Sequence, residues 1–192
     1  MLKSKRKHII NQMKTEFRAI SENEGLSRAM ICAMIAQLDV TVEELADVRC
    51  AISEAVTNAV VHAYRGASST DAADDTGDAF DDSRNTVYIL TTIYDDRSVK
   101  IIIRDRGCGI PDIRRAMEPL YTTDTTGERS GMGFAIMQSF MDTVKVKSAH
   151  GRGTTVEMRK KFSTPVSAAS AVQDDGGAEA ISAAEDGQED IA

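Results

Sequence analysis

The chain has 192 residues, 42% of them hydrophobic, which is enough for one domain with a real core. Its formal net charge of −7 resides in residues 163–192, which hold seven acids and no Lys or Arg, while the rest carries 23 charges of each sign. No run of about 18 apolar residues could span a membrane, and no basic stripe interleaved with aromatic residues points to direct nucleic-acid binding.

The N-terminus and the cysteines indicate the compartment. Residues 1–12 form a basic extension, and because no apolar stretch follows them we expect no secretory signal. Cys32, Cys50 and Cys108 have neither metal nor redox spacing, and their number is odd. Such cysteines fit a reducing environment, so we expect a cytoplasmic protein.

Residues 15–20 alternate in polarity in the manner of a β-strand, and a helix follows. Ser21 and Glu24 match a capping box, which predicts a helix to about Leu38. Four of its apolar residues are expected on the inner stripe: Leu26, Ala29, Met30 and Ala33. Arg28 then points away from the centre of that stripe.

A second capping box, Thr41 and Glu44, starts another helix. One broad face of this helix is apolar and is expected to meet the core: Leu45, Val48, Ile52, Ala55, Val56, Ala59 and Ala63. An acidic insert, residues 66–85, comes next and holds six Asp. The insert and the tail 163–192 have too few large apolar residues to offset the entropy of ordering, so we expect the insert to be mobile and the tail to be disordered.

The remaining elements read as two hairpins around two further helices. Residues 86–94 and 98–104 predict the first hairpin, and the run Ile101 to Ile103 favours a strand covered on both faces. A glycine-rich turn and a short helix follow, and then a Thr/Gly-rich segment over 119–130.

Residues 133–142 predict a helix with Phe134, Met137 and Met141 on one side, and 143–149 with 154–161 the second hairpin. Strands in two hairpins and three amphipathic helices favour the α/β class. We expect a two-layer sandwich, with a mostly antiparallel sheet and the helices on one face.

Two segments suggest where chemistry could occur. Glu54 and Asn58 are one helical turn apart, and an amide oxygen beside a carboxylate suits Mg²⁺ and a base, although a plain solvated helix face would look alike. Asp105 with Gly107 and Gly109 follows the Ile-rich strand. These glycines allow a flat ligand to approach and a buried Asp accepts hydrogen bonds from an amine, but a tight turn is the alternative.

A third segment opens the helix at residue 133. Gly131 and Gly133 would leave the amides at the helix N-terminus accessible, and such amides attract anions. No Lys-Ser/Thr pair follows these glycines, so the segment is not a Walker A loop.

In their order and spacing the three segments resemble the ATP-binding boxes of the Bergerat superfamily, which includes gyrase, Hsp90, histidine kinases and MutL. Residues 153–155 match its fourth box. The longer strings at 53–59, 118–123 and 128–137 resemble the anti-sigma F factors, a serine kinase family of that superfamily. The resemblance covers 13–162, which we expect to be an ATP-binding kinase domain interrupted by the acidic insert.

This resemblance implies ATP and Mg²⁺ as cofactors. Glu54 would be the catalytic base and Asn58 would hold Mg²⁺ against the phosphates. Asp105 would accept the adenine amino group, in a pocket shaped by two glycines and Thr154. The cofactor-binding residues are then Asn58, Asp105, Gly107, Gly109, Arg129, Ser130, Gly131, Met132, Gly133 and Thr154.

The resemblance also implies partners. Arg28 matches a position that holds protein partners in the family, although an ordinary solvated helix face explains it equally well. The family function is that of an anti-sigma factor and protein serine kinase. It inhibits a sporulation sigma factor, phosphorylates the anti-anti-sigma antagonist, and forms a homodimer through its first strand and helix.

Alternatives remain at this stage. A general-stress relative uses the same boxes, so the sigma factor is open, and a nucleotide-gated binding module without kinase activity is a further reading. A histidine-kinase catalytic domain is disfavoured, because no phosphoacceptor hairpin precedes residue 13. Two departures from the family pattern are the acidic insert and Asp124, where a basic residue is expected.

Overall fold

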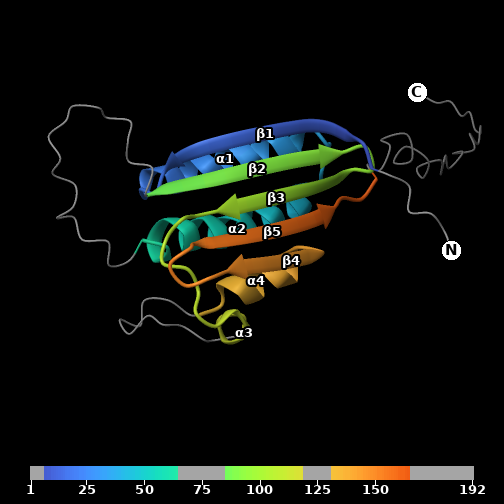
Figure 1. The fold of residues 1–192 in the computed structure, drawn as a ribbon. Coiled ribbons are helices and arrows are strands. Elements are labelled where there is room, and N and C mark those ends of the chain that lie inside the picture. Colours follow the sequence, from blue (N-terminus) through green and yellow to red (C-terminus); the bar gives the residue numbers. More distant parts are fainter. Residues whose placement is uncertain (1–6, 65–84, 119–130, 165–192) are drawn as a thin grey trace, which may run out of the picture.

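The computed structural model describes residues 7–64, 85–118 and 131–164. Its strands form one sheet in the order β1-β2-β3-β5-β4, and each neighbouring pair is antiparallel. Helices α1, α2 and α4 lie together on one side of that sheet (Figure 1). The expected two-layer α/β sandwich is thereby confirmed.

The elements run in the order in which the sequence predicted them. The strands are β1 (Ile9–Arg18), β2 (Thr86–Tyr94), β3 (Ser98–Arg104), β4 (Thr143–Ser148) and β5 (Thr154–Lys161). The helices are α1 (Glu22–Ala36), α2 (Val42–Thr57) with a π-helical continuation η1 (Asn58–His62), α3 (Ile113–Ala116) and α4 (Gly133–Phe140). In the described ranges no helix is long and apolar enough to cross a membrane.

Several predictions fall outside the described residues: most of the acidic insert, Arg129 and Ser130 with Asp124, and the tail beyond residue 164. At the N-terminus, β1 begins at Ile9 and ends at Arg18, so the strand predicted over 15–20 was placed too late. Residues 9–12, assigned to the extension, pair with β2 instead. This pairing is a long-range contact that local alternation does not report.

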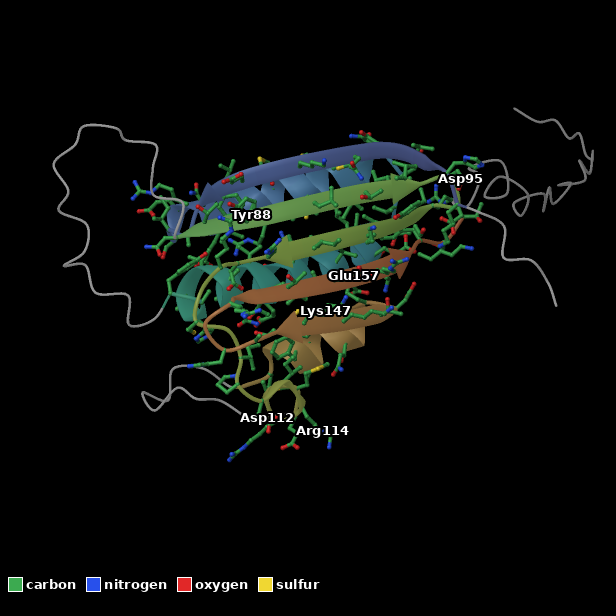
Figure 2. All side chains as sticks on the ribbon, in the orientation of Figure 1. Tyr88, Asp95, Asp112, Arg114, Lys147 and Glu157 are labelled. Carbon is green, nitrogen blue, oxygen red and sulfur yellow. The ribbon has the colours of Figure 1, made fainter. Side chains whose placement is uncertain are left out.

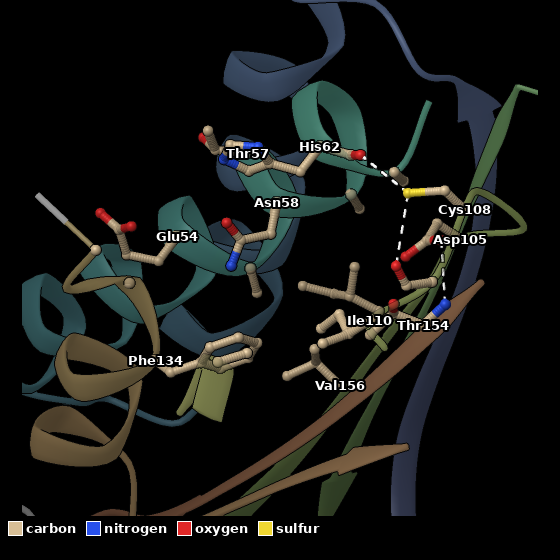
Figure 3. Close-up of a pocket in the computed structure, with 18 of the residues that line it drawn as sticks. Glu54, Thr57, Asn58, His62, Asp105, Cys108, Ile110, Phe134, Thr154 and Val156 are labelled. Atoms are coloured by element: carbon tan, nitrogen blue, oxygen red, sulfur yellow. Dashed lines mark hydrogen bonds between the residues drawn. The ribbon is translucent and has the colours of Figure 1, made fainter. Parts of the chain in front are cut away.

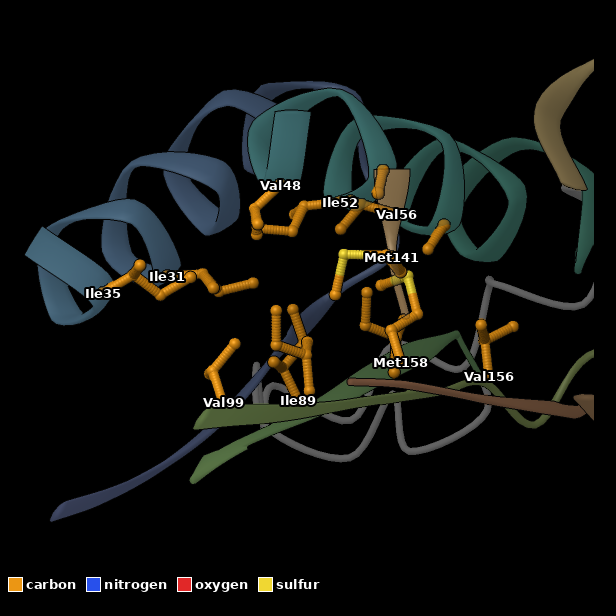
Figure 4. Packing of buried hydrophobic residues seen from close by; sticks show 14 of the residues in the cluster. Ile31, Ile35, Val48, Ile52, Val56, Ile89, Val99, Met141, Val156 and Met158 are labelled. Atoms are coloured by element: carbon orange, nitrogen blue, oxygen red, sulfur yellow. The ribbon is translucent and has the colours of Figure 1, made fainter. Parts of the chain in front are cut away.

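The core lies between α2 and the inner face of the sheet. Helix α2 begins at its predicted capping box: Glu44 N–H donates to Thr41 Oγ1 and Thr41 N–H to Glu44 Oε2, each at 3.1 Å. Its apolar face packs into one buried cluster with the sheet, as Figure 4 shows for Val48, Ile52 and Val56 above Ile89. Each such fully buried aliphatic side chain contributes about 1.5–3 kcal/mol to folding.

Helix α1 differs from its prediction in two ways. Its buried residues are Ser27, Ile31, Met34 and Ile35, whereas Leu26, Ala29 and Ala33 of the predicted stripe are exposed and Met30 is half-buried. The stripe rotates because it places two isoleucines and a methionine, rather than alanines, against the core.

The cap of α1 is also absent. Ser21 makes no side-chain capping bond, because its own backbone is already helical. Glu24, the other half of the predicted box, instead accepts a hydrogen bond of 2.9 Å from the Thr57 hydroxyl on α2. A contact between helices therefore replaces the local one.

Strand β3 is covered on one face only. Ile101 and Ile103 are buried beneath the helices, but Ile102 points to the opposite face and is half-buried. The expectation of a strand covered on both sides was wrong, since no described helix packs on that outer face.

Candidate functional site

A pocket of about 840 Å³ opens between α2–η1, the segment after β3, the start of α4 and the beginning of β5. Figure 3 shows Glu54, Asn58, Asp105 and Thr154 around this space. Most predicted site residues in the described ranges line it: Glu54, Asn58, Asp105, Gly109, Gly131, Met132, Gly133 and Thr154. The fold thus joins segments that were predicted separately along the chain.

Asp105 lies at one end of the pocket and is 5% exposed. Its Oδ1 accepts hydrogen bonds from the backbone N–H groups of Gly107 (2.9 Å) and Thr154 (3.1 Å). Burial raises the pKa of this carboxyl above its usual range, and these two N–H groups partly oppose the shift. Because the hydrogen bonds from described residues reach Oδ1, the second oxygen is free to accept from a ligand amine.

Glycine is required around Asp105 because backbone passes where a side chain would be. A Cβ on Gly107 would lie 1.9 Å from the carbonyl oxygen of Ala63, and one on Gly153 would lie 2.2 Å from that of Asp105. Gly109 also has a positive φ of 70°. The end of η1 is held here directly, since Cys108 N–H donates to the Ala63 carbonyl at 2.6 Å.

Ser148, on β4, organises the same end of the pocket and was not identified from the sequence. Its hydroxyl accepts from Ile110 N–H at 2.7 Å and lies 2.9 Å from both Gly153 O and Thr154 Oγ1. This one hydroxyl therefore ties the loop after β3 to the β4–β5 turn. Nothing in the local sequence distinguishes it from any other serine near a strand end.

The opposite end of the pocket is built on α2 and η1. Glu54 and Asn58 are half-buried and both line the pocket, where the functional interpretation places them. At Asn58 the α-helix widens into a π-helical turn, with Ala63 N–H donating to Asn58 O at 3.2 Å. Such π-helical turns often occur at functional sites, and this one also places His62 on the pocket wall.

The start of α4 approaches Glu54 closely. A Cβ on Gly133 would lie 2.9 Å from Glu54 Oε2 and 3.6 Å from Asn58 Nδ2. Gly131 also has a positive φ of 64°. The N-terminus of this eight-residue helix, with its positive dipole end and first amides that have no partner within the helix, therefore lies beside the carboxylate and the amide in the pocket.

Other pocket residues were not assigned roles from the sequence. The apolar part of the wall is formed by side chains on three strands or helices and one loop: Ile103, Ile110, Phe134 and Val156. Phe134 is half-buried, packs against the core and also lines the pocket. Thr57 and Arg115 also line it, and Asp112 caps the short helix that carries Arg115 by accepting its N–H at 3.0 Å.

A divalent cation would find few protein ligands in this pocket. The described residues contain no group of three or more His, Cys, Asp or Glu able to hold a metal ion. Asn58 offers one amide oxygen, and Glu54 a carboxylate one turn away. This donor set fits Mg²⁺, which typically keeps several waters and binds substrate phosphates together with one or two protein oxygens.

Arg28 lies on α1 and is not among the pocket-lining residues. Its side chain is partly exposed, beside exposed Leu26 and Ala29. Arg28 therefore lies outside the pocket.

A family model described as a histidine kinase-like ATPase domain matches residues 17–160. The chain is 42% identical over 152 residues to the anti-sigma F factor of Clostridium acetobutylicum, covering 79% of this chain and 94% of that protein. The anti-sigma F factor of Clostridium perfringens is 44% identical over 154 residues, which cover 80% of this chain and 99% of that protein. The chain belongs to the anti-sigma F factor family.

The match to a histidine kinase-like ATPase domain implies that the chain binds ATP. The anti-sigma F factor of Pasteuria penetrans is 44% identical, again over 79% of this chain. A crystal structure of the RsbU and RsbW domains of a Mycobacterium tuberculosis protein shares the fold, with a TM-score of 0.53 at 19% identity. The match covers 81% of this chain and 33% of that one.

Proposed function

We propose that this chain is an anti-sigma factor and an ATP-dependent protein serine kinase. It binds and inhibits a sporulation sigma factor in the cytoplasm and phosphorylates the anti-anti-sigma antagonist on serine. The observation that carries the proposal is the meeting of Glu54, Asn58 and the start of α4 at the end of the pocket opposite Asp105. The relatives named anti-sigma F factor support the same function.

ATP would lie with its adenine at Asp105 and its phosphates at α4. The Asp105 oxygen that is free of backbone bonds accepts from the exocyclic amino group, and the apolar wall receives the flat base. The phosphates then meet the amides at the start of α4, whose dipole favours negative charge. Arg129 and Ser130, just before that helix, complete the enclosure in this proposal.

Phosphoryl transfer needs positioning and charge neutralisation more than covalent help. The serine oxygen of the antagonist forms a bond to the γ-phosphorus as the bond to the β-phosphate oxygen breaks. Glu54 takes the proton from the serine hydroxyl. Asn58 would hold Mg²⁺, which would supply positive charge where negative charge builds up.

The partner surface is proposed to lie on α1 and β1, away from the pocket. Arg28 is flanked there by exposed Leu26, and the free edge strand β1 exposes Ile9 (56%) and Ile10 (60%). Exposed apolar side chains on an unpaired sheet edge are a typical basis for association. We assign this face to the sigma factor through Arg28 and to the homodimer through β1 and α1.

The kinase assignment is tested with ATP labelled at the γ-phosphate and the candidate antagonist. Glu54→Gln is expected to keep ATP affinity and to lower serine phosphorylation by about 100-fold or more, the scale of a lost general base. Glu43→Gln, an exposed change on the same helix, is the matched control and should leave the rate unchanged.

Normal phosphorylation by Glu54→Gln would remove the residue from the mechanism. If the wild-type protein bound ATP and sigma factor but transferred no label, it would be a nucleotide-gated binding module. Titration against sporulation and general-stress sigma factors identifies which of the two it inhibits.

A further inference from the structure

The outer face of the sheet, opposite the helices, carries a dense positive charge. In the alternation of the five strands, eight cations and two carboxylates point to this face: Lys14, Arg18, Lys100, Arg104, Lys145, Lys147, Arg159 and Lys161, with Glu16 and Glu157. Figure 2 looks onto this surface, from which Tyr88, Lys147 and Glu157 project. We call these ten residues the basic face.

The cations of the basic face are crowded by strand pairing. Lys100 lies directly opposite Arg159, and Lys145 and Lys147 are successive outward positions of one strand. Arg159 pairs with Glu157 at 2.8 Å. Like charges directly opposite each other destabilise a sheet, so a cover of negative charge would be favourable here.

The centre of this surface is less polar. Leu90 and Ile102 are cross-strand partners and are half-buried, and Tyr88 carries the Arg106 guanidinium 4.9 Å above its ring. A segment that binds this face would therefore need small apolar side chains as well as many carboxylates.

We propose that the basic face binds the chain's own acidic tail, residues 165–192. The tail holds seven acids, no Lys or Arg, and scattered Val, Ile and Ala. Its charge closely matches the excess of positive charge on the face. The family model ends at residue 160, so the tail lies outside the matched family domain.

The attachment point favours binding within one chain. The tail leaves the fold just after Lys161, and Ser163 is held to Glu44 by a 2.8 Å hydrogen bond from its backbone N–H. Nine residues, 165–173, precede the first tail acid, and they span up to about 30 Å when extended. The sheet has five strands about 4.8 Å apart, so its width is smaller than that reach. The tail acids can therefore reach cations on every strand of the face.

The acidic insert is a poorer occupant. Arg65 and Arg84 flank its six Asp, and both of its ends join the fold at one end of the sheet, at Tyr64 and Asn85. A tether of nine residues would give the tail an effective concentration in the millimolar range, which an acidic partner in solution would have to exceed. The bound tail thereby shields the face from polyanions.

Zero-length carbodiimide cross-linking tests this placement on the full-length protein. A mixture of ¹⁵N-labelled and unlabelled chains distinguishes links within a chain from links between chains. We expect tail carboxylates to link to Lys14, Lys100, Lys145 or Lys147 within one chain, and the yield to fall several-fold in about 1 M salt. Lys160, whose Nζ donates to the Phe140 carbonyl on the helix side, is the internal control and should not link. Links from the insert only, between chains only, or equally to Lys160 would overturn the proposal.

Heparin binding tests the shielding. Changing the seven tail acids to Asn or Gln in the full-length chain should tighten heparin binding at least about tenfold at low salt, given the charge dependence of polyanion contacts. Adding Lys145→Gln and Lys147→Gln should reverse most of that gain, whereas Lys3→Gln with Lys5→Gln, which removes the same charge elsewhere, should not. Unchanged heparin affinity in the neutral-tail variant, or equal reversal by both pairs, would refute the proposal.

Discussion

At the Asp105 end of the pocket the chain's own backbone fills the space, whereas at the Glu54 end side chains from one helix meet the start of another. Around Asp105 the carbonyl oxygens of Ala63 and Asp105 lie within 2.2 Å of where a Cβ would be on Gly107 or Gly153. At Gly133 the nearest group is the flexible tip of Glu54, at 2.9 Å. A side chain added at a glycine therefore meets rigid backbone at the first end and a movable side chain at the second.

The largest effect is expected from Gly107→Ala. The new Cβ would collide with backbone, which cannot give way as a side-chain tip can, so we expect a loss of about 3 kcal/mol of folding stability together with ATP binding. Thermal unfolding and calorimetric ATP titration measure the two losses. Wild-type stability in this variant would show that the two ends do not differ as described.

Asp105→Asn is expected to separate binding from stability at the rigid end. The amide oxygen still accepts the two backbone N–H bonds, but the group toward adenine becomes a donor, so ATP affinity should fall by about 10- to 100-fold. Isothermal titration with wild type as control measures this loss. An unchanged affinity would remove Asp105 from adenine recognition.

The difference in folding stability between wild type and Asp105→Asn should depend on pH. Because the pKa of Asp105 is raised on folding, the folded state binds the proton more readily, and wild-type stability falls as pH rises from the ordinary value through the raised pKa. Proton loss from Asp105 thus costs folding stability, and at neutral pH Asp105→Asn should be at least as stable as wild type. That advantage should vanish below about pH 4, which denaturant unfolding across pH checks. A variant that is less stable than wild type at neutral pH would contradict this sign.

A smaller effect is expected from Gly133→Ala at the flexible end. The added methyl displaces the Glu54 tip without touching backbone, so stability should change by less than about 1 kcal/mol. Misplacing the proposed base should lower serine phosphorylation by about tenfold, with ATP affinity nearly unchanged. A steady-state phosphorylation assay and an unfolding curve on the same sample test this. A large loss of stability would show that Gly133, like Gly107, cannot accept a side chain without disturbing the fold.

The smallest effect on stability and ATP affinity is expected from Arg28→Ala, because Arg28 lies outside the pocket. An exposed Arg changed to Ala typically alters stability by no more than about 0.5 kcal/mol, and ATP affinity should not move. Sigma-factor binding with MgATP present should weaken by about 2 kcal/mol, the scale of an interface Arg. Undiminished sigma-factor binding would show that Arg28 belongs to an ordinary solvated helix face.

The two long helices show how far local pattern predicts this fold. For α2, the capping box and the apolar face were both found as predicted, because Glu44 bonds to Thr41 through Oε2 while Ser163 reaches only Oε1, and because the stripe is broad. For α1, the same pattern failed at both points. Glu24 bonds to Thr57 on α2, and the buried stripe follows the large Ile31 rather than Leu26. A local pattern holds where a tertiary contact leaves the local bond in place, as at Glu44, and fails where it replaces that bond, as at Glu24.

By itself, the sequence determined the order of strands and helices and the glycine positions around Asp105, since hydrophobic period and turn chemistry act over a few residues. Only the tertiary structure decided that Ser148 ties the Asp105 end together and that η1 places His62 on the pocket wall. It also decided the basic face, whose cations occur singly along strands far apart in the chain. Strand pairing, with its period of two, is what brings Lys14 and Arg159 to one surface.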